Sequence, residues 1–579
     1  MKKLDFEIVI RKGHILDGTG NPWFKADIGI AHGRIVKISP LRLKQAEKTI
    51  DADGLIVCPG FINIHSHSDS TILSHNKAEN CLAMGLVTEL TGNCGSSVAP
   101  LTERYREFVL KKVQRRSFSL VEEKIDWLTL DDWIRKLEDK GIGINIAPLV
   151  GHGSLRSCTM GEEGEGGERI SPTEDEMNEM KSLLDGAMKD GAFGLSTGLI
   201  YAPGRNALTS EVIELSKVVA KHGGVYASHM RCEGNQLLEA TREFIEICES
   251  AGVRGTIAHH KASGSNNYGK ACETIRMVER ARVRGIDIII DQYPWRHGGV
   301  TKSLGARFVG QDSVMSREEL VEKLKDDDEC TKLLEDYVNR RETEIALYKE
   351  RSEKLEEKGG WTPKPYAMET GGTIIYSKTH PELEGRTFKE VAEHFGKEDI
   401  LEGLRDLLIE DEGWTCSGGE PYSEDDIITI LGYPWTTVST DQYAMDISKI
   451  SLKEMADALS MQHPRGWGTY AKILGKYVRK EGVLTIEEAI RKMTSLPASF
   501  LGLQDRGIIR EGFCADLVIF DPDIVDNTAT YGNPCLSPKG IPYVFVNGKL
   551  AIDNGRHTEA LSGKVLRNNK PRRFKFANT

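Results

Sequence analysis

Eight short apolar runs, most of them followed by an amphipathic stretch, are the feature that most restricts how this 579-residue chain can fold. Buried strands that alternate with helices are typical of a parallel (β/α)8 barrel, in which functional side chains lie at the carboxyl ends of the strands. We therefore predict an α/β protein built on a (β/α)8 TIM-type barrel. In chain order the runs are FINIHSH, LVTELTGNC, INIAPLVGHG, AFGLSTG, GVYASHM, GTIAHH, IDIIIDQY and WTTVSTD.

One of the intervening helices has clear boundary signals, in SPTEDEMNEMKSLLDGAMKDG. Ser171 is expected to be the N-cap, with Pro172 in the first turn and Glu174 at the third position of a capping box. Gly191 stands where a glycine C-cap would end the helix.

The two ends of the chain have a different sequence pattern. Short stretches in which apolar and polar residues alternate, typical of strands, lie between Gly, Asp and Pro breaks. We expect residues 1–58 and 506–579 to form one small β domain, a sandwich built from both termini. Residues 59–295 and 436–505 would form the barrel, and 296–435 an insertion between its seventh and eighth strands. The insertion contains a highly charged segment, RRETEIALYKERSEKLEEKGG, which predicts an exposed helix. The insertion is either a solvent-exposed addition to the barrel or a lid over the barrel mouth.

Composition excludes several classes of protein. The formal net charge of −11 is diffuse, which gives no reason to expect nucleic acid or an anionic membrane as a partner. No run approaches the length of about 18 apolar residues that a membrane span requires. Asp5, Glu7 and Arg11 interrupt the N-terminal apolar stretch, so we expect no signal peptide. Eleven cysteines without regular spacing favour reduced thiols and a cytoplasmic location.

Metal-ligand side chains gather at the ends of five of the predicted strands. His65 and His67 share one face of the first strand because alternate residues of a strand point the same way. Imidazole and thiolate together suit zinc, and a catalytic zinc site keeps one position open. The adjacent His259 and His260 point to opposite faces, and we assign His259 because Lys261 shares its face and would suit an anionic substrate. The other candidate ligands are Cys94, His229 and Asp441.

With these residues in place, the chain resembles the amidohydrolase superfamily and, within it, the N-acyl-D-amino-acid deacylase (D-aminoacylase) family. The resemblance covers nearly the whole chain except the insertion. HSH alone indicates only the superfamily, whereas the cysteine together with GLIY and HPR is much more specific. The motifs that carry the resemblance are PGFINIHSHSD, TGNCG, LVGHGSLR, GAFGLSTGLIYAPG, YASHMR, HHKASG, DQYPW and QHPRGWGTY.

The resemblance implies a site for one tightly bound Zn²⁺ and a second, weaker site. The counterparts of the tight ligands are Cys94, His229 and His259. His65, His67 and Asp441 would form the second site, with the thiolate able to bridge. Many superfamily members instead use a carbamylated lysine at the end of the fourth strand, but here that strand reads GLSTGL. Its lack of lysine weighs against hydantoinase or dihydroorotase chemistry.

The resemblance also implies the reaction, which is amide hydrolysis of a small N-acyl-D-amino acid to a carboxylate and a free D-amino acid. Asp441 would move the proton. The implied substrate-binding residues, which would recognise the carboxylate, are Tyr201, Lys261, Tyr293 and Arg465.

This chain departs from the family in two ways. Gln442 follows Asp441 where the family usually has glycine, and the insertion is longer than usual. Both departures leave the acyl group and the amino-acid side chain open. Two alternatives also stand: an amidohydrolase acting on a cyclic amide or a small D-configured peptide, and a metal-holding scaffold without catalysis. The sequence does not determine the oligomeric state.

Overall fold

The eight apolar runs form parallel strands that are hydrogen-bonded in the order of the sequence. The computed structural model describes residues 6–43, 46–107, 125–166, 169–298, 302–309, 315–362, 372–419, 421–449 and 463–568. One sheet has the order β6-β7-β8, and a second has the order β17-β13-β12-β11-β10-β9. The strands are β6 (Phe61–Asn63), β7 (Leu86–Thr91), β8 (Asn145–Pro148), β9 (Val150–Gly151), β10 (Gly194–Gly198), β11 (Val225–His229), β12 (Arg254–Ile257), β13 (Ile288–Gln292) and β17 (Thr436–Val438).

Short links join the two sheets into one ring. Only Leu149 separates β8 from β9, and its amide donates a hydrogen bond to the carbonyl of Thr91 at 2.9 Å. On the other side, a parallel bridge joins Ser66 to Gln442 just beyond β6 and β17. The third predicted run therefore contributes both β8 and β9, and the prediction of a (β/α)8 barrel is confirmed.

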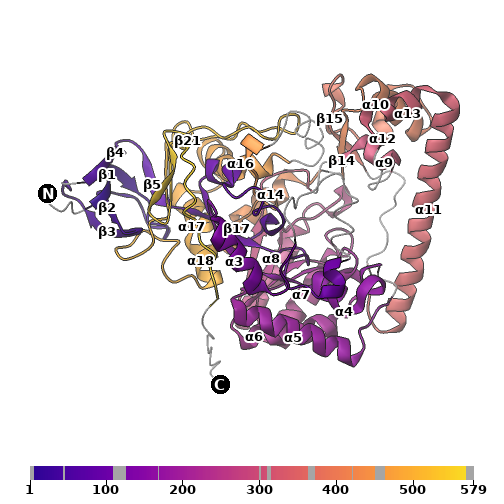
Figure 1. The fold of residues 1–579 in the computed structure, drawn as a ribbon. Helices are drawn as coiled ribbons and strands as arrows, with labels where there is room; N and C mark the ends of the chain where they lie inside the picture. Colours follow the sequence, from indigo (N-terminus) through magenta and orange to yellow (C-terminus); the bar gives the residue numbers. More distant parts are fainter. Residues whose placement is uncertain are drawn as a thin grey trace.

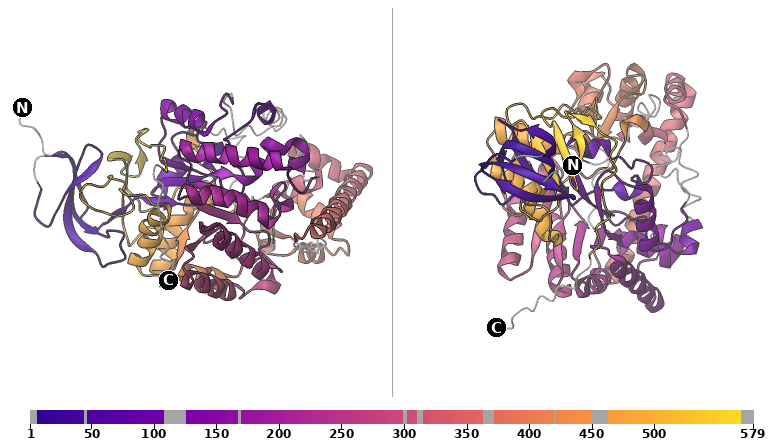
Figure 2. Two further views of the ribbon diagram at one scale, coloured as in Figure 1. Left: turned by 90° about the horizontal axis from the view of Figure 1, so that it is seen from below. Right: turned by 60° about the vertical axis from the view of Figure 1, so that its left-hand side comes forward.

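Helices surround the barrel, as Figure 2 shows. Helices α3 to α8 lie between successive strands, whereas α16 to α18 follow β17, the last strand of the barrel. Val212, Leu215 and Val219 of α6 (Thr209–Lys221), for example, have no exposed surface. Among the described helices, none is both long enough and apolar enough to cross a bilayer. The main helices are α3 (Leu130–Lys140), α4 (His152–Gly166), α5 (Glu174–Asp190), α6 (Thr209–Lys221), α7 (Leu237–Ala251), α8 (Ala271–Val283), α16 (Arg465–Lys472), α17 (Ile486–Met493) and α18 (Ser495–Leu501).

Helix α5 begins two residues later than its sequence signals suggested. Thr173 is the N-cap, and its hydroxyl accepts from the amide of Glu176, whose carboxylate in turn accepts from the amide of Thr173. The predicted N-cap at Ser171 and box position at Glu174 are therefore wrong, because the later Thr/Glu pair completes the reciprocal box. Gly191 ends the helix in the left-handed conformation, as predicted.

Strands from both ends of the chain share one nine-stranded sheet. β1 pairs with β2 along one edge. Along its other edge, the first part of β1 pairs with β4 and the last part with β5, so the sheet divides into two halves at this point. Ile10, Ile28, Leu517 and Phe545 from the two halves belong to a single buried apolar cluster. The strands are β1 (Phe6–Ile15), β2 (Phe24–Ala31), β3 (Arg34–Ser39), β4 (Ala46–Asp51), β5 (Ile56–Pro59), β18 (Leu517–Phe520), β19 (Tyr543–Val546), β20 (Lys549–Asp553) and β21 (Arg556–His557).

The insertion after β13 has an apolar cluster of its own, which includes Leu324, Val391 and Leu407. Its long helix α11 runs along the side of the molecule opposite the terminal sheet (Figure 1) and buries only Cys330 and Leu355, so the predicted exposed helix is confirmed. The elements are β14 (Lys302–Ser303), α9 (Leu304–Val309), α10 (Arg317–Lys325), α11 (Asp327–Glu357), β15 (Thr373–Tyr376), η4 (Pro381–Leu383), α12 (Phe388–His394), α13 (Ile400–Glu410) and β16 (Cys416–Gly418).

The barrel resumes before the expected end of the insertion. Helix α14 (Glu424–Gly432) lies within the range 296–435, yet Ile427, Ile430 and Leu431 belong to the apolar cluster of the barrel. This helix fills the place between β13 and β17 that the fold requires. The sequence did not reveal this role, because the helix directly follows the polar segment of the insertion.

Candidate metal centre

The six candidate ligands come from the carboxyl ends of five strands, where the barrel topology brings them together. His65 and His67 follow β6, Cys94 follows β7, and His229 is the last residue of β11. His259 and Asp441 follow β12 and β17. Cys94, His259 and Asp441 have φ values of 51°, 34° and 49°, in the left-handed region that side chains other than glycine rarely adopt. Such strain concentrates at functional sites.

Cys94 lies at the centre of the first ligand group. Its Sγ is 3.3 Å from His65 Nε2, 3.6 Å from His229 Nδ1 and 3.4 Å from His259 Nε2. A zinc ion with tetrahedral bonds of about 2.3 Å to sulfur and about 2.0–2.1 Å to nitrogen would hold these atoms about 3.5 Å apart. The observed separations therefore fit the edges of a zinc tetrahedron.

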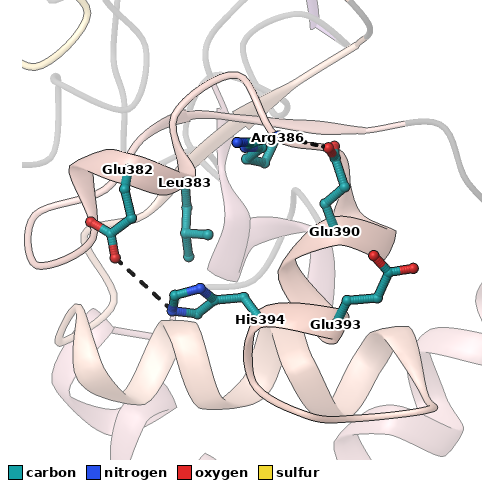
Figure 3. Close-up of a pocket in the computed structure, with 6 residues that line it drawn as sticks. All are labelled: Glu382, Leu383, Arg386, Glu390, Glu393 and His394. Atoms are coloured by element: carbon teal, nitrogen blue, oxygen red, sulfur yellow. Dashed lines mark hydrogen bonds and ion pairs between the residues drawn. The ribbon is translucent and has the colours of Figure 1, made fainter.

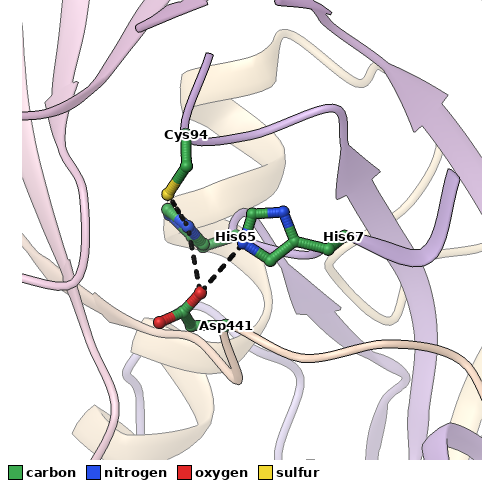
Figure 4. Close-up of side chains that lie close together, drawn as sticks. All are labelled: His65, His67, Cys94 and Asp441. Atoms are coloured by element: carbon green, nitrogen blue, oxygen red, sulfur yellow. Dashed lines mark hydrogen bonds and ion pairs between the residues drawn. The ribbon is translucent and has the colours of Figure 1, made fainter. Parts of the chain in front are cut away.

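A second group adjoins the first and shares Cys94 with it (Figure 4). Asp441 Oδ1 is 3.1 Å from His67 Nε2 and 3.5 Å from His65 Nε2. The ligand atoms of His65, His67, Cys94 and Asp441 all lie within 4.8 Å of one another, as do those of Cys94, His229 and His259. The arrangement thus offers two adjacent positions for a cation with a shared sulfur.

The neighbouring His260 does not face this site. Its Nε2 lies 2.7 Å from Thr274 Oγ1 on helix α8, on the outer side of the strand. The two adjacent imidazoles are thus separated by the strand, with His259 turned inward and His260 turned toward the helix layer.

The electrostatics favour the ionised forms of both anionic ligands. Burial by itself raises the pKa of a thiol, but the adjacent His65 and His259 lower the pKa of Cys94 well below its usual value. Burial opposes the ionisation of Asp441 in the same way, yet Arg465 and His259 hold the pKa of its carboxyl group well below the usual range. A thiolate and a carboxylate facing imidazoles form a donor set that attracts a divalent cation.

Two carboxylates that the sequence analysis missed, the buried Asp291 and the nearly buried Glu233, lie behind these histidines. Glu233 Oε1 is 3.1 Å from His259 Nδ1, and its Oε2 is 3.4 Å from His229 Nε2. Asp291, in β13, accepts from the amide of His259 at 2.8 Å and lies 3.5 Å from His65 Nδ1. Carboxylates in this position orient metal-binding imidazoles. Two features of the sequence could have revealed these carboxylates. Glu233 follows His229 by four residues, and Asp291 is an acid within an apolar strand.

Lys261 reaches the same pocket but is already paired. Its Nζ donates to Glu233 Oε1 at 2.6 Å and lies 2.9 Å from His259 Nδ1. Because His259 Nδ1 must carry a proton if its Nε2 is to bind a cation, Nδ1 donates to Glu233 and does not accept from Lys261. The ammonium group therefore keeps N–H donors for a substrate. The expectation of an unpaired cation for an anionic substrate is therefore corrected: the charge of Lys261 is balanced by Glu233.

The remaining predicted residues line the mouth of the barrel. Arg465 Nη1 forms an ion pair with Asp441 Oδ2 at 2.8 Å, and the guanidinium carbon stands 4.5 Å from the ring centre of Tyr293. The ring of Tyr201 packs edge-on against His229, with 48% of the residue exposed. Tyr422, from the segment between β16 and α14, lies over Lys261 at 5.7 Å. All ten predicted residues thus lie at or beside one site.

Known proteins resemble this chain in sequence and in fold. The model of the amidohydrolase family matches residues 453–552. The chain is 30% identical to the D-aminoacylase of Alcaligenes xylosoxydans xylosoxydans over 97% of each chain. A crystal structure of D-aminoacylase has a TM-score of 0.71 and 30% identity, covering 97% of this chain and all of that one. The N-acyl-D-glutamate deacylase of Bordetella bronchiseptica, solved with zinc and a phosphonate mimic of the tetrahedral intermediate, has a TM-score of 0.70 and 28% identity, covering 98% and 100%.

Proposed function

Because the chain belongs to the amidohydrolase superfamily and, within it, to the N-acyl-D-amino-acid deacylase family, we propose that it hydrolyses N-acyl-D-amino acids in a zinc-dependent reaction. The products are a carboxylate and a free D-amino acid. The observation that carries the proposal is the grouping of Cys94, His229 and His259 at sulfur–nitrogen separations that fit a zinc tetrahedron, with His65, His67 and Asp441 beside them. We also propose a cytoplasmic location, which the eleven free cysteines support.

The ligands divide into a tight and a weaker zinc site. Cys94, His229 and His259 would hold the tight ion, because a thiolate and two buried imidazoles are its preferred donors. His65, His67 and Asp441 would hold the weaker ion, with the sulfur of Cys94 between the two positions. Zinc, when bound, polarises the acyl carbonyl and supplies a nucleophilic water at neutral pH.

Asp441 transfers the proton in this proposal. Its carboxylate accepts the proton of the attacking water and delivers it to the departing amine nitrogen. In the free protein, Arg465 stabilises the anion at 2.8 Å. When a substrate carboxylate takes over the ion pair of Arg465, that stabilisation weakens and the pKa of Asp441 rises toward the value of an effective base. Substrate binding would therefore prepare the residue that moves the proton.

The substrate carboxylate is proposed to bind opposite the metal ligands. Arg465 offers a planar fork of donors for two parallel hydrogen bonds, and its stacking on Tyr293 orients that fork. Tyr201 stands next to His229 and is exposed enough to reach a ligand. An N–H of Lys261 that Glu233 does not accept adds one more donor.

Glu233 acts as a positioning residue. It contacts the outer nitrogens of His229 and His259, so their inner nitrogens, Nδ1 and Nε2 respectively, are directed at Cys94. The same carboxylate holds Lys261 through a buried ion pair. Glu233 thereby contacts both the metal-binding histidines and the lysine of the substrate pocket.

Paired enantiomers test the reaction directly. Zinc-loaded protein is incubated with N-acetyl-D- and N-acetyl-L-amino acids that carry neutral and acidic side chains, and free amine and acetate are quantified. We expect equal amounts of amine and acetate from the D series. Preference for the L series would reject the stereochemical assignment. Ring opening of a cyclic amide without a second product would indicate the alternative amidohydrolase chemistry.

A further inference from the structure

A second group of imidazoles and carboxylates lies on the insertion, outside the barrel. His380 immediately precedes η4, Glu382 lies within η4, and His394 is the last residue of α12. Glu410 is the last residue of α13. These four residues come from three adjoining elements of the insertion, and the proposed deacylation uses none of them.

The first three residues direct nitrogen and oxygen atoms at a common point. His380 Nδ1 is 3.0 Å from Glu382 Oε1, and His394 Nε2 is 4.0 Å from the same oxygen. The two imidazole rings are 5.6 Å apart and nearly perpendicular, at 74°. All three atoms lie within 4.8 Å of one another. Figure 3 shows Glu382 and His394 facing each other across the pocket.

The hydrogen bonding of His380 determines which of its nitrogens is free to bind a cation. Its Nε2 lies 2.6 Å from Glu410 Oε2, which is an acceptor, so Nε2 carries a proton. In the neutral ring Nδ1 then presents a lone pair to Glu382. Two acceptors at 3.0 Å repel each other unless a cation lies between them. Either a second proton on His380 or a metal ion satisfies that requirement.

The group also has the outer carboxylate that is typical of metal-binding histidines. Such histidines usually donate their second ring N–H to a carboxylate, which fixes the tautomer and the ring orientation. Glu410 is placed for this role on His380. Two imidazoles and one carboxylate are the donors that zinc and other late first-row divalent ions prefer.

Buried side chains fix the backbone beneath the group. Leu383 of η4 and Val391 of α12 are 3% and 0% exposed and belong to the apolar cluster of the insertion. Thr387 caps α12 through a reciprocal box with Glu390. The backbone positions of Glu382 and His394 are therefore set by packing, so an ion needs only to select side-chain rotamers.

The pocket beside the group has room and charge for a hydrated cation. It has a volume of about 320 Å³ and is lined by Glu382, Leu383, Arg386, Glu390, Glu393 and His394. Its one arginine, Arg386, is paired with Glu390 at 3.0 Å (Figure 3), which reduces its repulsion of a cation. Glu393, which also lines the pocket, is paired with Lys389 at 3.8 Å.

We propose that His380 Nδ1, Glu382 and His394 Nε2 form a further zinc-binding site outside the barrel, which joins η4 to the end of α12. Glu410 positions His380 through its Nε2–H. Water completes the coordination, because the side chains of Glu382 and His394 are 56% and 39% exposed. This site binds a late first-row divalent ion independently of the barrel and stabilises the insertion.

Zinc stoichiometry tests the proposal. Wild-type protein and the His394→Ala and His380→Ala variants are dialysed against the same ZnCl2 concentration, and bound zinc is measured by mass spectrometry. We expect each variant to bind one zinc ion per chain fewer than wild type. The matched control is His222→Ala, because His222 pairs with Asp185 at 2.8 Å on the barrel surface and lies outside the proposed zinc group. That variant should bind as much zinc as wild type, and all variants should keep wild-type deacylase activity.

Hydrogen exchange provides a second readout that does not depend on alanine variants. Excess ZnCl2 should slow exchange in peptides from η4 and α12 of the wild type, but not in Glu382→Gln, which keeps the size of the side chain. Equal zinc content in wild type and the His380→Ala/His394→Ala double variant would overturn the proposal. In that case His380 holds a second proton between Glu382 and Glu410, as its raised pKa allows; hydrogen bonds to Glu382 and then Glu410 are the cause of that shift.

Discussion

The barrel and the insertion both bring histidines and carboxylates together, but in opposite environments. In the barrel, His65 and His259 are 0% and 2% exposed, and a second carboxylate layer lies behind them. In the insertion, the side chains of His394 and Glu382 are 39% and 56% exposed. Burial strengthens electrostatic interactions and limits rotamers, so the barrel group is rigid and responds strongly to the loss of one charge. In the two proposed sites, the same residue types therefore serve a catalytic role where they are buried and a structural role where they are exposed.

Replacing Asp441 should produce the largest effect and tests the catalytic side of the comparison. Asp441→Asn removes the proton acceptor, so kcat/KM should fall by roughly 10²- to 10⁴-fold. Zinc should remain with Cys94, His229 and His259, since Asp441 is outside that group. Activity and bound zinc are measured together, with the exposed Asp523→Asn as control. Wild-type turnover in Asp441→Asn would contradict the assigned role.

A substitution that creates a cavity in the insertion tests whether the insertion and the barrel unfold independently. Leu407 is fully buried in the apolar cluster of the insertion, so Leu407→Ala should reduce the free energy of unfolding of that region by about 2–5 kcal/mol. Hydrogen exchange should show the loss in α10, α12 and α13, with protection of the barrel strands unchanged. The control is Leu347→Ala on α11, where the leucine is 41% exposed. An equal loss of protection in the strands would show that the regions unfold together.

Glu233→Gln tests the carboxylate layer of the barrel. Glutamine keeps the shape of the side chain but loses the charge that contacts His229, His259 and Lys261. Zinc affinity should fall by roughly 10- to 100-fold. The rate of zinc transfer to a chelator measures this effect, with the exposed Glu239→Gln as control. Unchanged zinc retention would remove Glu233 from the metal centre.

A partly exposed ion pair at the start of α5 should have the smallest effect. Glu176 lies at the start of α5 and pairs with Arg169, and this hydrogen bond, with smaller contributions from Thr173, lowers its pKa to about 2. A carboxyl group with a depressed pKa stabilises the fold above its unfolded pKa of 4.5, and this contribution is lost as the pH falls toward 2. Solvent screening limits it to about 1 kcal/mol or less.

The measurement compares urea unfolding of wild type and Glu176→Gln between pH 7 and pH 2. The difference in the free energy of unfolding should be present at pH 7 and should disappear between pH 4.5 and pH 2. A difference that persists at pH 2 would assign the effect to the capping box of Thr173 and not to the charge.

The sequence determined the parts of this protein that depend on local pattern. Alternating apolar runs predicted the strands, and ligand-type residues at their ends predicted which side chains would meet, because parallel strands end at one face of a barrel. The helix that contains Glu176 was predicted, but its start was placed two residues too early, since the choice between two caps depends on hydrogen bonds that only the folded chain reveals.

Only the tertiary structure decided the partners of these residues. Glu233 balances the charge of Lys261, and Asp291 contacts His65 from a strand far away in the chain. Helix α14 belongs to the barrel although it follows the insertion directly. The apolar pattern of a segment indicates which of its faces is buried. The pairing of two buried charges depends instead on the distances between segments, and these distances are set only when the barrel closes.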